Sequence, residues 1–359
     1  MPFAGVPIVS ATAWQVVALE DYPGNLWRDW QRLAVDHHAT NPMLDAEFAR
    51  LLAQYFGDRL HVLIGLRGGD TVMLALVEPA SLARWQGFRP SQAQAALIVC
   101  SPECEIVPGV VVAAFPSRCL RLDLFALDPR EHGPLLKDFD SVQRLPSVRN
   151  ICVELKGEFD DYWQQRPRNL RKNTRRYRTR LVEEVGEVGL RVAHDKASVV
   201  SATDRYGIME SRGWKGRIGT ALHPGNLQGQ FYRDFMASMA ERGRAFVFEL
   251  YTGDRLLASR LCVTGDGILV ILKTTFDEDL KRYAVGRQLL YELLQYLFEG
   301  RQASVVDFYT DASRDQMDWA TSDRFMQHAS VYPSVTTMRA YTAGKQALAL
   351  AARVKGGQR

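Results

Sequence analysis

The segment Tyr283 to Gln288 has the residue types of a phosphate-binding turn. It stands directly before an apolar helical run with leucines at positions 289, 290, 293, 294 and 297. A glycine at a helix start lets the backbone approach phosphate oxygens, and the N–H groups of the first turn attract an anion. Tyr283, Gly286 and Arg287 are therefore candidate cofactor-binding residues. A glycine that only begins a helix is the alternative.

Three charged side chains near this turn are candidate catalytic residues. Lys273 lies near the end of a predicted strand, where it could orient a phosphate or carboxylate, and Asp277 follows it and could instead cap a turn. Asp307 stands among the apolar residues of 305–308. Burying a carboxylate is costly unless it is paired, so Asp307 either has a partner or is a base with a raised pKa.

Trp214 and Lys215 are candidate substrate-binding residues in the sequence Arg212-Gly-Trp-Lys-Gly216. An indole between glycines could stack on a sugar or a base, and the neighbouring ammonium could bind an anionic group. A tryptophan that fills the core is the alternative.

Residues 168–180 form a predicted helix with seven cationic side chains and no acidic one. Its apolar residues fall opposite a stripe that contains Arg171 and Arg175, so the helix is amphipathic. Without these seven charges the chain has 38 basic and 41 acidic residues, so the whole positive excess of +4 is local. Arg171 and Arg175 are candidate contacts for an anionic partner such as a phosphorylated donor, RNA or a membrane surface. The alternative is a solvated face that pairs with surface carboxylates.

Residues 228–310 carry the clearest pattern of secondary structure. An amphipathic helix at 228–242 precedes strands at 245–251, 255–263 and 268–275, and a helix from 286 leads to a strand at 305–309. The order helix, strand, Gly-Asp hairpin and strand also occurs at 45–77, offset by 184 residues. Further strands are expected at 95–99, 109–115 and 119–126, with a surface connection from 128 to 146.

This order predicts an α/β (α+β) protein of two similar halves, with mixed sheets flanked by helices. We expect a degenerate first half at 1–147, a second half carrying the site at 148–330, and a strand and helix tail at 331–359.

The composition is that of an ordinary globular protein, with 47% hydrophobic and 24% charged residues. No apolar run is long enough to span a bilayer and no signal peptide is evident. The five cysteines are odd in number and scattered, which is typical of free thiols in a reducing cytoplasm. Neither a metal-ligand cluster nor a nucleophile elbow, Walker loop or dinucleotide fingerprint is present, so no metal site is expected.

The pattern at 150–325 resembles the GNAT superfamily, and in particular the CelD/BcsL-type acetyltransferases, relatives of the FemAB peptidyltransferases. The matching residues include Phe231-Tyr232, Gly253-Asp254, Lys273 with Phe276-Asp277-Glu278, Tyr283 to Gly286, Asp307-Phe308 and Trp319-Ala320. The resemblance implies two tandem GNAT-like halves and direct N-acyl transfer from acetyl-CoA or another acyl-CoA to an amine-bearing small molecule or amino sugar. It also implies a role in polysaccharide or cell-envelope biosynthesis.

The chain departs from the GNAT pattern at the donor turn. The pattern has Arg or Gln, two residues, Gly, one residue, then Gly or Ala, whereas this chain has Tyr283 first and Gln288 last. An acyl carrier protein or an aminoacyl-tRNA is therefore an alternative donor. A different alternative is a non-catalytic module whose basic helix binds RNA or an anionic membrane.

Overall fold

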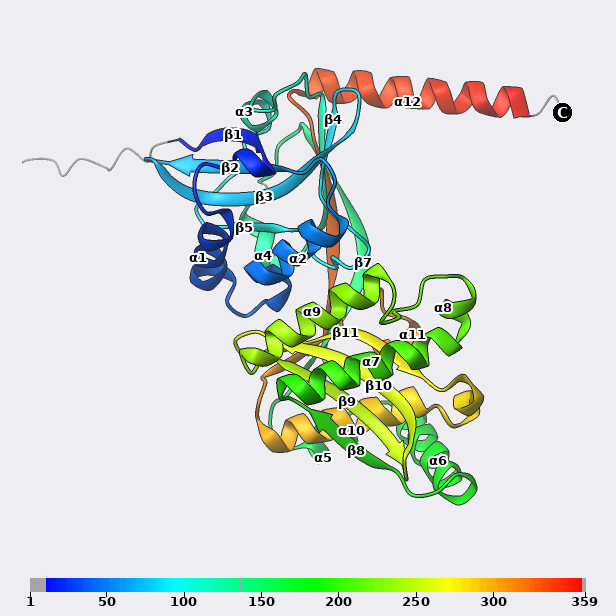
Figure 1. Cartoon of the computed structure of the whole chain (residues 1–359). Helices are drawn as coiled ribbons and strands as arrows, with labels where there is room; N and C mark the ends of the chain where they lie inside the picture. Colours follow the sequence, from blue (N-terminus) through cyan, green and yellow to red (C-terminus); the bar gives the residue numbers. More distant parts are fainter. Residues whose placement is uncertain (1–10, 136, 357–359) are drawn as a thin grey trace, which may run out of the picture. The chain divides into compact units, whose positions relative to one another are not determined.

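The computed structural model describes residues 11–135 and 137–356 and divides the chain into two compact units. The first unit comprises residues 1–38, 56–147 and 325–359, and the second comprises 39–55 and 148–324. The division expected from the sequence was linear, whereas both units are discontinuous, because the segment containing helix α2 (Ala46–Phe56) groups with the second unit. Figure 1 shows the elements of both units.

The first unit has a mixed sheet with the strand order β1-β2-β3-β4-β6-β13, and β5 also pairs with β3. The strands are β1 (Ala13–Ala18), β2 (His61–Arg67), β3 (Asp70–Ser81), β4 (Arg84–Gly87), β5 (Ile98–Cys100), β6 (Arg121–Leu127) and β13 (Ser322–Val331). The helices are α1 (Leu26–His38), α3 (Pro108–Ala113), α4 (Pro129–His132) and α12 (Val335–Gly356). Only β4 and β6 run parallel among these pairs.

Two expectations for this half were wrong. Residues 109–115 are not a strand, because Pro108 takes the first position of helix α3, where its missing N–H costs nothing. The expected surface connection is also shorter, since strand β7 (Val142–Glu154) begins before Pro146.

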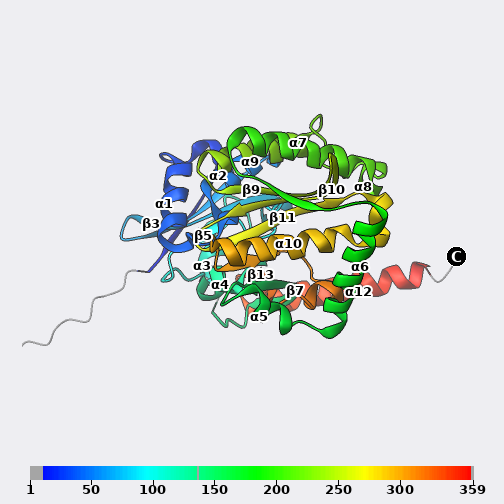
Figure 2. The same ribbon diagram turned by 90° about the horizontal axis from the view of Figure 1, so that it is seen from below.

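The second unit has a mixed sheet with the order β7-β12-β11-β10-β9-β8. Its further strands are β8 (Gly189–Ala193), β9 (Ala245–Thr252), β10 (Arg255–Thr264), β11 (Ile268–Phe276) and β12 (Val305–Asp307). Helices α7 (Lys196–Arg212) and α9 (Leu227–Glu241) cover one face, and α10 (Val285–Gly300) covers the other beside α6 (Arg168–Glu184), as Figure 2 shows. The short helices are α5 (Phe159–Gln164), α8 (Trp214–Arg217) and α11 (Arg314–Met317).

The described residues also include four 3-10 turns: Leu19–Asp21, Pro42–Leu44, Gly133–Leu135 and Glu278–Tyr283. The buried leucines of α10 pack with residues of β9, β10 and β11 into one hydrophobic core, as their helical spacing predicted. On the opposite face, Phe48 of α2 packs against Phe235 of α9, with ring centroids 4.8 Å apart.

The repeated order of elements is confirmed, and with it the predicted fold of mixed sheets flanked by helices. Helix α2 leads through β2 and a two-residue hairpin to β3, and α9 leads through β9 and a two-residue hairpin to β10. The hairpin loops are Gly68-Gly69 and Gly253-Asp254, so they correspond at an offset of 185 rather than 184.

Candidate functional site

Strands β11 and β12 form a parallel pair that is short and then opens. Their registered pairs end at Val270 with Asp307, yet β11 continues to Phe276 without a β12 partner. A pocket of about 400 Å³ lies at this opening, and we call it the divergence pocket. Its wall includes Thr274 and Phe276 of β11, Phe308 after β12, Gly286 and Arg287 of α10, and Tyr177 of α6. Side chains of α6, β11, α10 and the segment after β12 therefore meet at this opening.

The start of helix α10 supplies backbone donors to this pocket. Ala284, the residue before the helix, has the left-handed conformation at φ 51°, which costs an alanine roughly 1 kcal/mol. Its carbonyl accepts hydrogen bonds from the N–H groups of Arg287 (2.8 Å) and Gln288 (3.1 Å). Within residues 11–135 and 137–356, no acceptor is assigned to the N–H groups of Val285 and Gly286. Two donors are therefore open to an anion at this helix start.

The other turn residues lie apart from the pocket wall or are already paired. Tyr283 is buried, and its hydroxyl donates to Glu184 (2.6 Å), which lowers the pKa of that exposed carboxyl. Arg287 lines the pocket and forms an ion pair with Asp315. Gln288 is fully buried and donates to the carbonyl of Thr174 on α6 (2.9 Å). Gly286 and Arg287 thus border the divergence pocket, and Tyr283 belongs to the surrounding core.

Arg260 is a pocket residue that sequence reasoning missed. It lies on β10 opposite Thr274, and its Nη2 donates to the carbonyl of Gly286 (3.3 Å). Its Nε is buried and has no partner in the described part of the chain. Burial lowers the pKa of Arg260 to about 10. An arginine in the middle of an otherwise apolar strand run was the one available signal, because such a charge is costly without a role.

Lys273 lies on the side of the sheet that is covered by α7 and α9, near Glu210 and Lys215. Its ammonium is 5.5 Å from the centre of the Tyr232 ring of α9. Burial and the nearby Lys215 lower the pKa of Lys273, while Glu210 opposes that shift. Glu210 is itself buried, accepts from the N–H of Leu222 (2.7 Å), and forms an ion pair with Lys215. The structure therefore brings together two of the predicted residues, Lys273 and Lys215.

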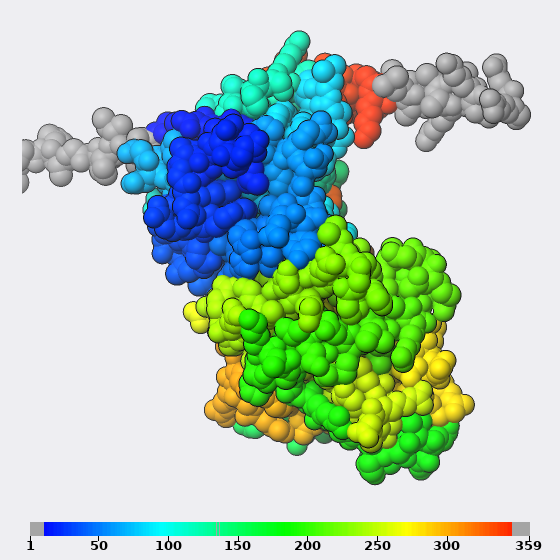
Figure 3. Space-filling model, viewed as in Figure 1, coloured from blue at the N-terminus to red at the C-terminus, as the bar shows by residue number. Residues whose placement is uncertain are grey.

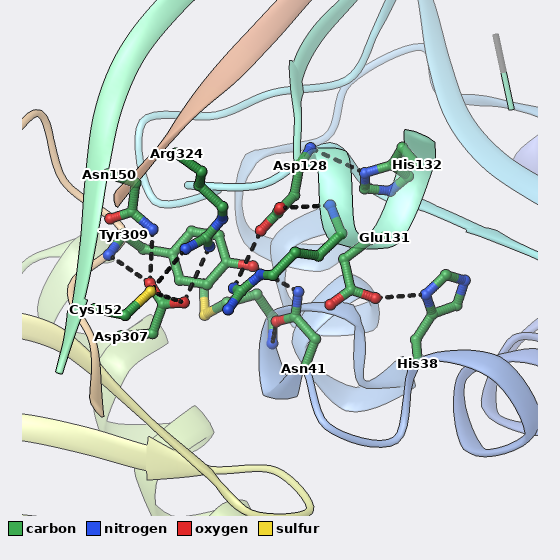
Figure 4. Close-up of polar contacts among 12 residues, drawn as sticks. His38, Asn41, Asp128, Glu131, His132, Asn150, Cys152, Asp307, Tyr309 and Arg324 are labelled. Carbon is green, nitrogen blue, oxygen red and sulfur yellow. Dashed lines mark hydrogen bonds and ion pairs between the residues drawn. The ribbon is translucent and has the colours of Figure 1, made fainter. Parts of the chain in front are cut away.

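Asp307 is completely buried and has several partners (Figure 4). It accepts from Asn150 Nδ2 (2.6 Å) and from the N–H of Tyr309 (3.2 Å), and it pairs with Arg324 Nη2 at 3.0 Å. Tyr309 has a positive φ of 40°, which is uncommon for an aromatic residue. Asp307 thus lies in a network of hydrogen bonds and an ion pair at the end of β12. Figure 4 also shows a separate contact of the first unit, in which His38 pairs with Glu131 (2.8 Å).

Asp277 and Trp214 lie on the outer part of the second unit. Asp277 caps the turn that starts at Glu278, accepting from Asp279 N–H (3.1 Å), and it pairs with Arg255 (2.7 Å). Trp214 is 54% exposed, so the alternative that it fills the core is wrong. The backbone N–H of Trp214 donates to the side-chain carboxylate of Glu278 (2.7 Å). Helices α7, α8 and α9, which include Trp214 and Lys215, form much of the surface seen in Figure 3.

Helix α6 has the predicted amphipathic form. Leu170 and Leu181 are buried, and Arg175 is exposed. Arg171 donates to the side chain of Gln164 (2.7 Å). Of the seven cations, Arg178 and Arg180 form ion pairs, and no carboxylate partner is found for the others within the described residues.

No three His, Cys, Asp or Glu side chains in the described ranges gather as metal ligands. No described helix is both long and apolar enough to cross a bilayer. The five cysteines form no disulfide and are buried.

Comparison with known protein families gives one match, which lies within the second unit. Residues 168–319 match the family described as "Acetyltransferase (GNAT) domain". No curated protein of established function matches the chain in sequence.

Solved structures share the fold over most of their length. One is the C-terminal domain of a putative lysylphosphatidylglycerol synthetase from Agrobacterium fabrum, with a TM-score of 0.54 and 14% identity, covering 89% of this chain and 96% of that one. FemX has a TM-score of 0.51 at 9% identity, covering 86% and 96%. L-PGS from Bacillus licheniformis has a TM-score of 0.50 at 10% identity, covering 87% and 94%. At these identities the likeness concerns the fold alone.

Residues 168–319 carry a GNAT acetyltransferase domain, and the protein is an acyltransferase, as the sequence resemblance implied.

Proposed function

We propose that the protein is an N-acyltransferase that binds an acyl-CoA in the divergence pocket. The observation that carries this proposal is the opening between β11 and β12 directly beside the free N–H groups of Val285 and Gly286. A pantetheine arm needs a narrow, largely apolar channel, and a diphosphate needs backbone donors at its end. Arg260 adds positive charge to the same pocket, and Arg287 lies there in an ion pair with Asp315.

We propose that the amine acceptor approaches from the side of Lys215 and Lys273. Thr274 lines the donor pocket, whereas Lys273, the preceding residue of β11, lies by Tyr232 of α9. A strand places successive side chains on opposite faces, so donor and acceptor would meet across one strand. Because burial lowers its pKa, Lys273 has a larger neutral fraction than a surface lysine and can accept the proton of the attacking amine.

Asp307 has a different role in this proposal. Its network fixes the end of β12 where the two strands separate, so it acts as a positioning residue. Asp277 has a similar role at the turn before α10, while Trp214 and Lys215 lie on the acceptor side. Transfer itself requires no acyl-enzyme: the amine nitrogen attacks the thioester carbonyl, the C–S bond breaks, and the thiol leaves.

The acceptor class follows from the family resemblance. We propose an amine-bearing small molecule or amino sugar, used in polysaccharide or cell-envelope biosynthesis, and a relationship to the CelD/BcsL-type enzymes. Five cysteines that form no disulfide suit a reducing compartment such as the cytoplasm. The matched fold of FemX keeps an aminoacyl-tRNA donor as a second candidate, and the buried Gln288, where a small residue is usual beside a diphosphate, favours it.

The variant Gly286→Asp tests the donor site. A Cβ at position 286 would meet Phe276 at 3.6 Å, an ordinary contact, so the fold is expected to survive. The added carboxylate repels the donor phosphates, and acetyl-CoA affinity should fall at least about tenfold. Thermal-shift titration with acetyl-CoA and longer acyl-CoAs measures this change.

The matched control is Gly344→Asp, on the exposed part of α12, which should bind as the natural chain does. Equal affinity of Gly286→Asp and the natural chain for every acyl-CoA would disprove the donor site. No shift with any CoA in the natural chain would favour a tRNA or carrier-protein donor.

A further inference from the structure

A second hollow lies between helices α6 and α10, and we call it the α6–α10 groove. It measures about 1220 Å³ and belongs entirely to the second unit. Thr174, Arg175 and Arg178 of α6 line it from one side, and Gln288 and Tyr291 of α10 line it from the other. Its lining shares no residue with that of the divergence pocket, although both touch α6.

Two polar atoms are left without partners in this groove. Thr174 is 5% exposed and Gln288 is 0% exposed, and both line the groove. Thr174 Oγ1 and Gln288 Oε1 are buried and have no hydrogen-bond partner among the described residues. Gln288 Nε2 is used, since it donates to the Thr174 carbonyl (2.9 Å). An unsatisfied buried polar atom costs about 1–3 kcal/mol, so two of them in one lining indicate a ligand that supplies N–H or O–H donors.

The cations of the groove are mostly not neutralised. Arg178 pairs with Glu292, and Arg180 pairs with Glu184 (3.3 Å). The remaining cationic residues of the lining have no carboxylate at ion-pair distance within residues 11–135 and 137–356: Arg168, Arg171, Lys172, Arg175 and Arg176. Like charges this close repel one another, so an anion with more than one charge would relieve them.

Aromatic side chains add a third kind of contact. Trp163 of α5 and Tyr291 of α10 both line the groove and meet edge to face, with centroids 4.9 Å apart. Both are only partly buried. An aromatic surface next to arginines is suited to stacking with a heterocyclic base.

We propose that the α6–α10 groove binds a nucleoside diphosphate, either free or as the activated end of a larger molecule. The free cations of α6 contact the two phosphates, Trp163 or Tyr291 stacks on the base, and Thr174 Oγ1 and Gln288 Oε1 accept from base N–H or ribose O–H groups. A long RNA would follow the exposed face of α6 and leave the two buried oxygens unpaired. The groove exceeds the volume usual for a drug-sized ligand, which leaves room for an attached group.

The test is calorimetric titration of the full chain with UDP and ADP, and with pyrophosphate and uridine as partial ligands. We expect one site for at least one of the two diphosphates, bound more tightly than pyrophosphate or uridine. Arg175→Glu should weaken binding at least about tenfold. Lys196→Glu is the matched control, because it makes the same change of charge at an exposed position of α7, and it should have no effect.

The variant Thr174→Val distinguishes a site that recognises its ligand through the Thr174 hydroxyl from a surface that attracts anions by charge alone. Valine has the shape of threonine without the unpaired hydroxyl, so the melting temperature should stay the same or rise while diphosphate affinity falls about 2- to 10-fold. Unchanged affinity in Thr174→Val, or pyrophosphate binding as tightly as UDP and ADP, would overturn the proposal. So would the absence of binding, or capture of single-stranded RNA that neither diphosphate displaces.

This inference is independent of the proposed acyl-CoA site. Gly286→Asp should bind UDP as the natural chain does, and Arg175→Glu should retain its thermal response to acetyl-CoA. Loss of both ligands in either variant would contradict the separation of the two sites.

Discussion

Replacing Asp307 by asparagine keeps the shape of the side chain and removes its charge. The carboxylate is completely buried and contacts Arg324 at 3.0 Å, Asn150 at 2.6 Å and the N–H of Tyr309 at 3.2 Å. The Arg324 side chain is only 11% exposed, so its guanidinium keeps a buried charge that this carboxylate no longer balances. Breaking a buried pair from one side costs about 3–5 kcal/mol, a large part of the ~5–15 kcal/mol that stabilises a typical domain.

Urea unfolding of Asp307→Asn, followed by circular dichroism, measures this loss. The double variant Asp307→Leu with Arg324→Met removes both charges and should recover at least about 2 kcal/mol of it, because no unbalanced charge remains. A loss below about 1 kcal/mol in the single variant would refute the reasoning. Activity gives a second readout: a positioning residue leaves the pH profile of kcat unchanged, whereas loss of a proton acceptor removes its acidic limb.

Three further predictions concern single side chains of the second unit and the thiols. The pKa of Lys273 is lower in the folded chain than in the unfolded chain. Between that lowered pKa and about 10.4, the unfolded chain therefore binds more protons, so the contribution of Lys273 to the free energy of unfolding rises with pH across this window. Lys273→Met should remove that slope in urea unfolding, stabilise the protein at pH 7 and abolish transfer; a variant less stable at pH 7 would contradict this. Burial raises the pKa of Cys100 and Cys262 to about 12, so iodoacetamide at pH 8 should label neither until the chain unfolds, as mass spectrometry can test. Gly265→Ala should cost about 1–3 kcal/mol on thermal unfolding, since its Cβ would overlap the carbonyl of Thr40, and an unchanged melting temperature would be evidence against that contact.

The sequence predicted the second unit better than the first. Periodicity identified α9, β9, β10, β11 and α10 to within one or two residues, because each has a regular apolar face. It misassigned residues 109–115, where a run of valines and alanines suits either a strand or a helix and Pro108 decided the outcome.

The candidate site was only partly accessible from the sequence. The order of β11, turn, α10 and β12 indicated where donor residues gather, because a parallel pair must return through a helix. Arg260 was visible only as an unusual charge in an apolar strand run, and neither Arg260 nor Glu210 could be assigned to the site, since their roles depend on which strand or helix they face. Nor could the sequence show that Gln288 of α10 and Thr174 of α6 approach each other, because 114 residues separate them.

The discontinuous second unit has a consequence for synthesis on the ribosome. Helix α2 ends at Phe56, and the helix it packs against, α9, starts only at Leu227, about 170 residues later. At a synthesis rate of ~5–20 residues per second, the aromatic and leucine face of α2 has no helix to pack against for roughly 10–30 s, until α9 has been made. Over that interval Phe48 is a natural contact for a chaperone on the nascent chain. Rare codons between positions 56 and 227 should therefore lower the yield of soluble protein more than the same codons placed after α9.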